Sequence, residues 1–329
     1  MRPSASTCSW FKMTTSEGLP ERVRVIEVGP RDGFQMEERF VPTRLKVETV
    51  EGLVAAGVAE IEATSFVHPR VIPQMADAAE VLGRIKDRWD VRLSVLVPNL
   101  EGARRALEIG GVDELRVVVC ATESYNRRNV GLSIDESADR FARIAEAAQE
   151  HGVDASVVFG VALGCPIEGD VPIERVVELT ERFVELGAAA IGVADSYGLA
   201  NPVQVGAAVR AVREVLAGRR LWLHLHNTRG MALANALAAL EEGVDSFDTA
   251  FGGLGGTPVM KGASGNIATE DLAYMCSEMG LDTGVDIDGV RAVSRRVAAF
   301  LGRTLPSHVL TAGTKQELMA LNRSRASTR

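Results

Sequence analysis

The chain alternates eight times between a short apolar segment and a segment with the spacing of an amphipathic helix. The apolar segments are short and rich in β-branched residues, as buried parallel strands are. They lie at Val23–Val28, Glu60–Phe66, Arg92–Val97, Leu115–Cys120, Ala155–Ala162, Ala190–Ala194, Leu221–His226 and Ser246–Phe251. Eight βα units in series restrict the fold to a closed barrel or an open, doubly wound sheet.

The closed barrel is favoured over the open sheet for two reasons. A (β/α)8 barrel takes about 250 residues, which fits the span of the eight units. No GxGxxG motif follows the first apolar segment, as a dinucleotide-binding sheet would require. The clearest helical segments are Thr43–Ala56, Asp135–Gln149, Pro172–Leu186 and Arg229–Glu242.

We therefore predict an α/β protein with a (β/α)8 TIM barrel, a short N-terminal tail and a C-terminal helical extension. Residues 1–21 form a flexible tail, and residues 22–305 form the catalytic barrel with an added helix at Asp286–Leu301. Residues 306–329 form a C-terminal tail. The whole chain of 329 residues thus holds one folded domain.

Composition excludes several classes of protein. A net charge of −8 argues against a nucleic-acid partner. No apolar run reaches the ~18 residues of a membrane helix, and four scattered cysteines indicate neither a disulfide framework nor a structural zinc site. Residues 1–21 lack the apolar run of a secretory signal. We expect a cytoplasmic protein, or one of an organelle matrix if this tail is a transit peptide.

Polar side chains follow the predicted strands at their carboxyl ends, where barrel enzymes carry their active sites. The residues at these positions are Arg31, Asp32, Glu62, Ser65, Asp195, His224, His226 and Asn266. A barrel core needs none of them, and buried charges are costly unless they are paired or metal-bound. Their coincidence at one end therefore predicts a functional site.

His224 and His226 are the sharpest local signal, because residues i and i+2 of a strand point to the same face. With oxygens from Asp32 and Asn266 they could bind one divalent cation, Mg²⁺ or Mn²⁺, with Zn²⁺ as an alternative. The competing interpretation is a pair of hydrogen-bonded core histidines.

Each remaining candidate has a structural and a functional interpretation. Arg31 forms a salt bridge at a strand end or stabilises a developing oxyanion, and Glu62 is expected to position it. Asp195 caps the next segment or supports a ligand histidine. Gly255 belongs to a glycine-rich run that indicates a mobile loop or a substrate channel. Asn129 closes a small basic cluster that is an exposed loop or a contact for substrate phosphates.

Several long motifs in order resemble the 3-hydroxy-3-methylglutaryl-CoA lyase family of the DRE-TIM metallolyase superfamily. They are VGPRDGFQ at 28–35, IEATSFVHP at 61–69, PQMAD at 73–77, GCPIEGD at 164–170, HLHNTRGMALAN at 224–235 and GLGGTPVMKGASGNIATEDL at 253–272. The resemblance implies a TIM barrel that binds a divalent cation, cleaves a 3-hydroxyacyl-CoA to acetyl-CoA and a ketoacid, and forms a homodimer.

The resemblance also implies roles for individual residues. Asp32, His224, His226 and Asn266 match the metal ligands, and Arg31 matches the arginine that stabilises the enolate oxygen. The further active-site residues are Glu62, Ser65 and Asp195, with Gln35 at the mouth of the barrel.

Three positions depart from the family pattern. Thr257 stands where the family has a proton-transferring loop cysteine, Glu38 replaces a lysine, and Arg229 replaces a tyrosine. A threonine hydroxyl does not titrate near neutrality. Three alternatives therefore stay open: a lyase for citramalyl-CoA or for a glutaryl-CoA with a longer 3-substituent, a condensing acyltransferase of the isopropylmalate synthase type, and a non-catalytic acyl-CoA-binding barrel.

Overall fold

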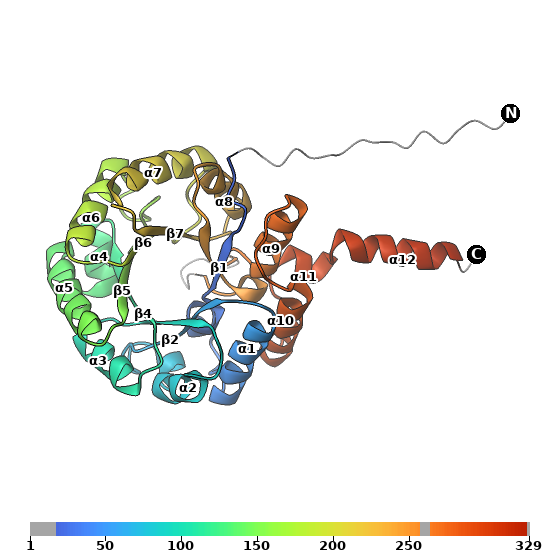
Figure 1. The fold of residues 1–329 in the computed structure, drawn as a ribbon, viewed down its shortest axis with the longest axis horizontal. Helices are drawn as coiled ribbons and strands as arrows, with labels where there is room; N and C mark the ends of the chain where they lie inside the picture. The colour runs from blue at the N-terminus through green and yellow to red at the C-terminus, as the bar shows by residue number, and fades with distance from the viewer. Residues whose placement is uncertain (1–17, 257–263, 328–329) are drawn as a thin grey trace.

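The computed structural model describes residues 18–256 and 264–327 and has a closed barrel at its centre (Figure 1). Eight parallel strands run in sequence order around the barrel, and β1 also pairs with β8. The strands are β1 (Arg24–Glu27), β2 (Glu60–Ser65), β3 (Arg92–Leu96), β4 (Glu114–Cys120), β5 (Asp154–Gly160), β6 (Ala190–Asp195), β7 (Arg220–Leu225) and β8 (Ser246–Thr249). The predicted TIM barrel is confirmed.

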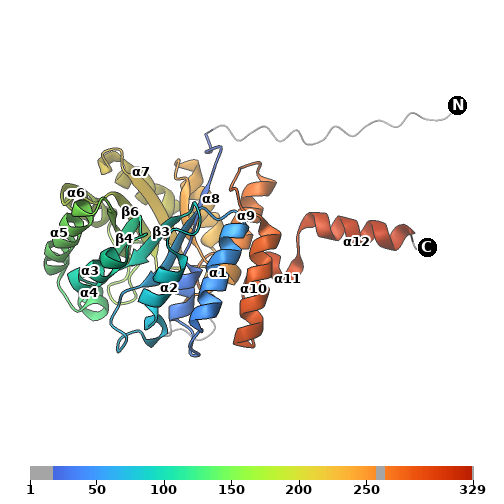
Figure 2. The same cartoon turned by 60° about the horizontal axis from the view of Figure 1, so that its bottom comes forward.

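Helices surround the barrel, and the extension packs beside α1 (Figures 1 and 2). The α-helices are α1 (Thr43–Ala55), α2 (Ala78–Ile85), α3 (Leu100–Ile109), α4 (Glu123–Val130), α5 (Ile134–Glu150), α6 (Ile173–Glu185), α7 (Pro202–Val215), α8 (Ala232–Glu241), α9 (Thr269–Glu278), α10 (Ile287–Leu301), α11 (His308–Ala312) and α12 (Lys315–Ser327). Three short helical turns complete the fold: η1 (Gly29–Gly33), η2 (Pro73–Met75) and η3 (Phe251–Gly253).

Because side chains alternate between the two faces of a strand, the barrel has an apolar core outside its strands and a polar layer inside them. On β4, Leu115, Val117 and Val119 belong to the apolar core between strands and helices. Arg116 lies between them and reaches Asp248 on β8, on the inner side of the barrel. The outer face is thus apolar, whereas the inner face carries a layer of charged side chains.

Local chemistry explains where the helices begin and what they bury. Ser133 and Glu136 form a reciprocal capping box at the start of α5. Phe141 on the buried face of this helix packs edge-on against Phe183 of α6, with ring centroids 5.2 Å apart. The helical ring is therefore joined laterally as well as to the strands.

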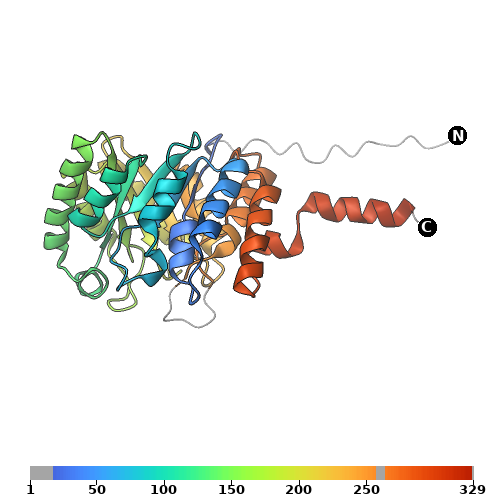
Figure 3. The same ribbon diagram turned by 90° about the horizontal axis from the view of Figure 1, so that it is seen from below.

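Two segments differ from the sequence-based expectation. The basic cluster near Asn129 was expected in a loop, but it belongs to α4. Residues 306–329 were expected as a tail, but they contain α11 and α12, and α12 extends away from the barrel (Figure 3). Neither helix has a long apolar stripe, which is why periodicity did not reveal them. No helix in the described part of the chain is long and apolar enough to span a membrane.

Replacing Gly57 with alanine should destabilise the protein by about 3 kcal/mol. Gly57 has φ +83°, and a Cβ there would lie 2.2 Å from the carbonyl oxygen of Gly284, so strain and a backbone clash add together. Gly187→Ala is the matched control, since its φ is +90° but a Cβ would meet nothing within 4 Å. Urea denaturation should show a loss of about 1–2 kcal/mol for the control. Equal losses would contradict the clash.

Candidate metal centre and active site

Asp32 and Arg31 lie in η1, a π-helical turn that follows β1 directly. The amides of Arg31 and Asp32 both donate to the carbonyl of Val28 at the strand end, which closes the turn. Single π turns are frequent at functional sites. The turn holds both side chains at the mouth, the carboxyl end of the barrel strands.

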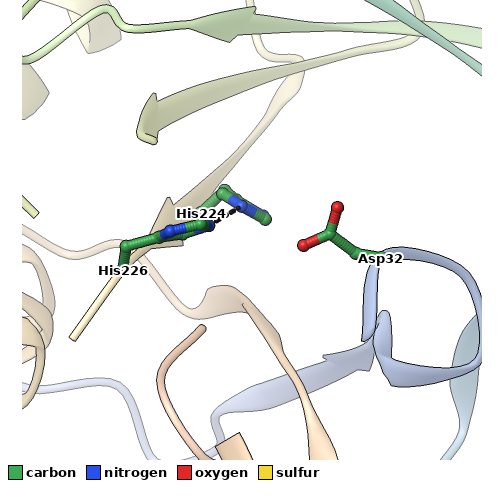
Figure 4. A group of neighbouring side chains, drawn as sticks. All are labelled: Asp32, His224 and His226. Atoms are coloured by element: carbon green, nitrogen blue, oxygen red, sulfur yellow. Dashed lines mark hydrogen bonds between the residues drawn. The ribbon is translucent and has the colours of Figure 1, made fainter. Parts of the chain in front are cut away.

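His224 and His226 reach the mouth from β7 and its end. The two Nε2 atoms are 3.1 Å apart, and the side chain of Asp32 points toward them from the opposite side (Figure 4). One ligand atom from each of the three residues lies within 4.8 Å of the others. The predicted convergence of the two imidazoles with Asp32 is therefore present in the structure.

Asn266 joins this group because the segment after η3 folds back against β7. Ile267 donates its amide to the carbonyl of Leu225, and Asn266 bridges to His226. The Asn266 Nδ2 donates to Asp32 Oδ2 at 2.7 Å, whereas its Oδ1 is buried without a hydrogen-bond partner. The free oxygen is the atom that a cation would use.

The charge states of Asp32 and His226 suit a divalent cation, whereas at His224 the effect of burial is outweighed by Asp248, which raises the pKa of the imidazole. Burial alone would raise the pKa of Asp32, but Arg31, the two histidines and Asn266 lower it to about 2. Burial, reinforced by His224, lowers the pKa of His226 to about 3. The site thus presents a carboxylate, a neutral imidazole and an amide oxygen, and the buried Nδ1 of His226 has no partner. These residues fit a hard or borderline divalent metal.

Arg31 is fixed by two carboxylates and keeps spare donors. Its Nε and one Nη lie 2.8 and 2.6 Å from Glu62 Oε2, and its other Nη lies 2.5 Å from Asp32 Oδ1. Gln35 donates to the same Asp32 oxygen at 2.9 Å. Since a guanidinium has five N–H groups, two remain for a substrate oxygen. Glu62 thus holds the guanidinium by a buried ion pair, and its role in positioning Arg31 for catalysis stays a prediction.

The other predicted site residues lie in different surroundings. Gly255 packs against the cluster, since a Cβ there would lie 2.5 Å from Asn266 Nδ2. Ser65 is buried and accepts from the amide of Val67. Asn129 is exposed on α4, with its Nδ2 3.7 Å from Cys120 Sγ. Thr257 lies outside the described residues.

Asp195 shapes the segment after β6. Its carboxylate accepts from the amides of Leu199 and Ala200 at 2.8 and 2.9 Å. Its backbone carbonyl accepts from the amide of His226 at 3.2 Å. The capping interpretation therefore accounts for this side chain, and a catalytic role for Asp195 stays a prediction.

Sequence reasoning missed two buried carboxyl groups, Asp248 and Glu27. Asp248 on β8 lies 3.1 Å from His224 Nδ1, the contact that had been considered for Asp195. Both residues occupy strand positions where an alternating pattern places a polar side chain inside the barrel. The alternation of polar and apolar residues along these two strands, together with the spacing of the two histidines, could have identified both carboxyl groups from the sequence.

Glu27 joins two turns at the mouth. Its Oε1 accepts from the amides of Gly29 in η1 and Phe251 in η3, at 2.7 and 3.0 Å. Its Oε2 accepts from the hydroxyl of Thr269 at 2.6 Å. Burial raises the pKa of Glu27 to about 8, although these donors offset part of the effect. This carboxyl group thus holds η1, which carries Arg31, against η3.

Glu27→Gln should remove a pH dependence of stability. As pH rises from 4.5 to about 8, the unfolded chain loses the Glu27 proton while the native protein keeps it. The free energy of unfolding then falls by about 1.4 kcal/mol per pH unit from this group. The amide oxygen of the variant can accept from Gly29 and Phe251, and its NH2 group can donate to Thr269 Oγ1 as the protonated Oε2 would, so urea denaturation at several pH values should isolate the titration. Glu38→Gln, at an exposed position, should leave the parent slope unchanged. An unchanged slope in Glu27→Gln would contradict this titration.

Comparison with known proteins places the chain among similar sequences and structures. A protein-family model described as HMGL-like matches residues 22–297. The rat protein named 3-hydroxy-3-methylglutaryl-CoA lyase, cytoplasmic, is 42% identical over 301 residues, which cover 92% of this chain and 88% of that protein. Several other relatives carry the name of a mitochondrial hydroxymethylglutaryl-CoA lyase.

Solved structures agree with the sequence comparison. The crystal structure of the Bacillus subtilis HMG-CoA lyase has a TM-score of 0.86 and 38% identity, covering 89% of this chain and 98% of that one. An HMG-CoA lyase from Acinetobacter baumannii, in complex with coenzyme A and 3-methylmalate, has a TM-score of 0.85 and 41% identity. That likeness covers 90% of this chain and 96% of the other.

Proposed function

Since the chain belongs to the HMGL-like family, we propose that it is a metal-dependent carbon–carbon lyase that cleaves 3-hydroxy-3-methylglutaryl-CoA to acetyl-CoA and acetoacetate. The observation that carries this proposal is the convergence of Asp32, His224 and His226 at the mouth of the barrel. A purely structural histidine pair would not need a third ligand group or the free oxygen of Asn266 beside it.

The residues that would hold the cation are Asp32, His224, His226 and Asn266. A bound Mg²⁺ or Mn²⁺ would lower the pKa of the substrate 3-hydroxyl and neutralise its carboxylate. Mg²⁺ and Mn²⁺ are favoured over Zn²⁺ because two of the four donors are oxygens, and because substrate oxygens would complete an octahedral set.

Arg31 is proposed to stabilise the charge that forms when the C2–C3 bond breaks. A base at the mouth takes the proton of the 3-hydroxyl, whose oxygen becomes the carbonyl oxygen of the ketoacid. The electron pair of the C2–C3 bond moves to the thioester, whose oxygen becomes negative as the ketoacid leaves. The two spare N–H groups of Arg31 can donate to this oxygen from a fixed position, because Glu62 and Asp32 already hold the guanidinium. Preorganised donors of this kind contribute most where charge develops.

The remaining step adds a proton to the enolate carbon, and the family cysteine for that step is absent. The cysteines of the described residues do not replace it, because Cys120, Cys165 and Cys276 are all buried. Burial raises the pKa of Cys120 and of Cys276 to about 12. We propose that water or another acid at the mouth supplies this proton.

Thr257→Cys should raise kcat on 3-hydroxy-3-methylglutaryl-CoA by about 10²-fold, the lower end of a general-acid contribution. A thiol titrates near the working pH and a hydroxyl does not. The measurement is the rate of acetyl-CoA release by the parent and the variant, with Thr257→Ser as the control. An unchanged rate would mean that another acid already performs the step.

The proposed function is tested by offering the metal-loaded protein a panel of acyl-CoA thioesters. The panel contains 3-hydroxy-3-methylglutaryl-CoA, citramalyl-CoA and a glutaryl-CoA with a longer 3-substituent. We expect acetyl-CoA release to be fastest from the first. Release from none of them, with Mg²⁺ or Mn²⁺ present, would refute the lyase function.

Two expectations stay predictions. A homodimer is expected from the family resemblance, and sedimentation equilibrium would measure it. A cytoplasmic location is expected from the sequence, although named relatives include both cytoplasmic and mitochondrial proteins. Localisation of a C-terminally tagged chain in its own cells would decide between the two compartments.

A further inference from the structure

We propose that Asp248 is a positioning residue that fixes the orientation and the tautomer of His224 for metal binding. The inference rests on the proposed function, because it takes His224 as a ligand. Asp248 belongs to β8, and in the register of the sheet it lies directly beside His224 of β7. Its Oδ2 is 3.1 Å from His224 Nδ1, and both side chains are buried.

The carboxylate of Asp248 is itself held from two sides. Arg116 donates an Nη–H to Oδ1 at 3.0 Å, and Trp222 donates its indole N–H to Oδ2 at 3.1 Å. The guanidinium of Arg116 also lies over the Trp222 ring, 4.8 Å from its centroid. With these donors in place, the carboxylate has little freedom to rotate away from the imidazole.

This arrangement decides which nitrogen of His224 faces the cluster. A carboxylate accepts, so the Nδ1 of His224 must carry the hydrogen. In the neutral ring Nε2 is then left with its lone pair, and this is the atom that lies 3.1 Å from His226 Nε2. A hydrogen bond from the second ring nitrogen to a carboxylate is the usual way in which a protein orients a ligand histidine.

His226 provides an internal contrast. Its Nδ1 is buried and has no hydrogen-bond partner. The two imidazoles are therefore unequal: Asp248 holds His224 in advance, whereas His226 has no such carboxylate partner among the residues that the structure describes. We infer that His224 is the preorganised ligand of the pair.

Arg116 connects this pair to the charged layer deeper in the barrel. It lies 3.3 Å from Glu60 and 3.6 Å from Glu114, and all three side chains are buried. Glu114 shares the arginine but does not contact Asp248 or His224. It therefore offers a matched control: a carboxylate of the same layer, with the same burial and without the histidine.

The test is the affinity of the full-length protein for Mn²⁺, measured by titration calorimetry. Asp248→Asn should bind Mn²⁺ about 10- to 100-fold more weakly than the parent protein, as losses of such partners do. Glu114→Gln should bind Mn²⁺ with the affinity of the parent protein, even if its thermal midpoint falls as far as that of Asp248→Asn. Equal Mn²⁺ affinities for Asp248→Asn and the parent, or equal losses in both variants, would overturn the inference.

A second measurement does not depend on how the variants fold. In the metal-free parent protein labelled with ¹⁵N-histidine, NMR at a pH where the ring is neutral should show His224 with its hydrogen on Nδ1. A His224 with its hydrogen on Nε2 would overturn the proposal. If the parent protein neither binds Mn²⁺ nor releases acetyl-CoA, the proposed lyase function is refuted. The tautomer of His224 still tests separately whether Asp248 orients the imidazole.

Discussion

Replacing Arg31 with glutamine is expected to lower kcat by about 10³-fold, with a much smaller change in KM. The reason is that the spare guanidinium N–H groups face charge that exists only after the C2–C3 bond begins to break. The loss should therefore concentrate in the chemical step. Steady-state kinetics of acetyl-CoA release would measure both constants.

Arg31→Lys is the informative companion. It retains the positive charge but cannot match the two-pronged contact with Glu62 and the contact with Asp32 together. We expect it to recover only part of the lost kcat. Circular dichroism should be recorded for both variants, since breaking a buried ion pair costs about 3–5 kcal/mol of stability. A large rise in KM at constant kcat would mean that Arg31 binds the substrate rather than the transition state.

His226→Ala should abolish measurable Mn²⁺ binding and lower kcat by at least about 10³-fold. A metal that stabilises transition-state charge by about 4 kcal/mol accounts for a factor of this size. His226 contributes an imidazole that burial keeps neutral, and the described residues hold no other histidine beside His224 that could take its place. Calorimetric titration with Mn²⁺ and acetyl-CoA release are the two measurements.

His151→Ala serves as the control for this variant, because His151 is exposed at the end of α5. Its metal affinity and kcat should equal those of the parent. Retention of tight Mn²⁺ binding by His226→Ala would show that the predicted ligand set is wrong. Loss of turnover with Mn²⁺ affinity intact would assign His226 to the substrate instead.

The sequence predicted the barrel and the convergence at its mouth because both follow from simple periodicities. Strands recur with β-branched residues, and His224 and His226 are two residues apart, which places them on one face. Once the strands are parallel and in order, their carboxyl ends must meet, so Asp32 approaches the histidines although it is distant in sequence.

The contacts between individual side chains inside the barrel could not be predicted in the same way. Asp248 contacts His224 because β7 and β8 are neighbours in a particular register. That register is set by side-chain packing around the whole barrel and not by any local motif. Asp195 shows the reverse case. It lies on the same face of β6 as Ile191 and Val193, which belong to the apolar outer core, so its carboxylate turns to nearby backbone amides.

The ionic layer beneath the mouth has a consequence for the conditions in which the protein can work. Arg116, Glu60 and Glu114 are buried, so dissolved salt screens their attraction much less than that of surface charges. High salt weakens ion pairs at the surface, whereas the buried ion pairs of this layer keep most of their attraction. The cost of dehydrating such charges also falls on warming. The ionic layer beneath the active site should therefore be less sensitive to high ionic strength and to moderate heating than ion pairs at the surface.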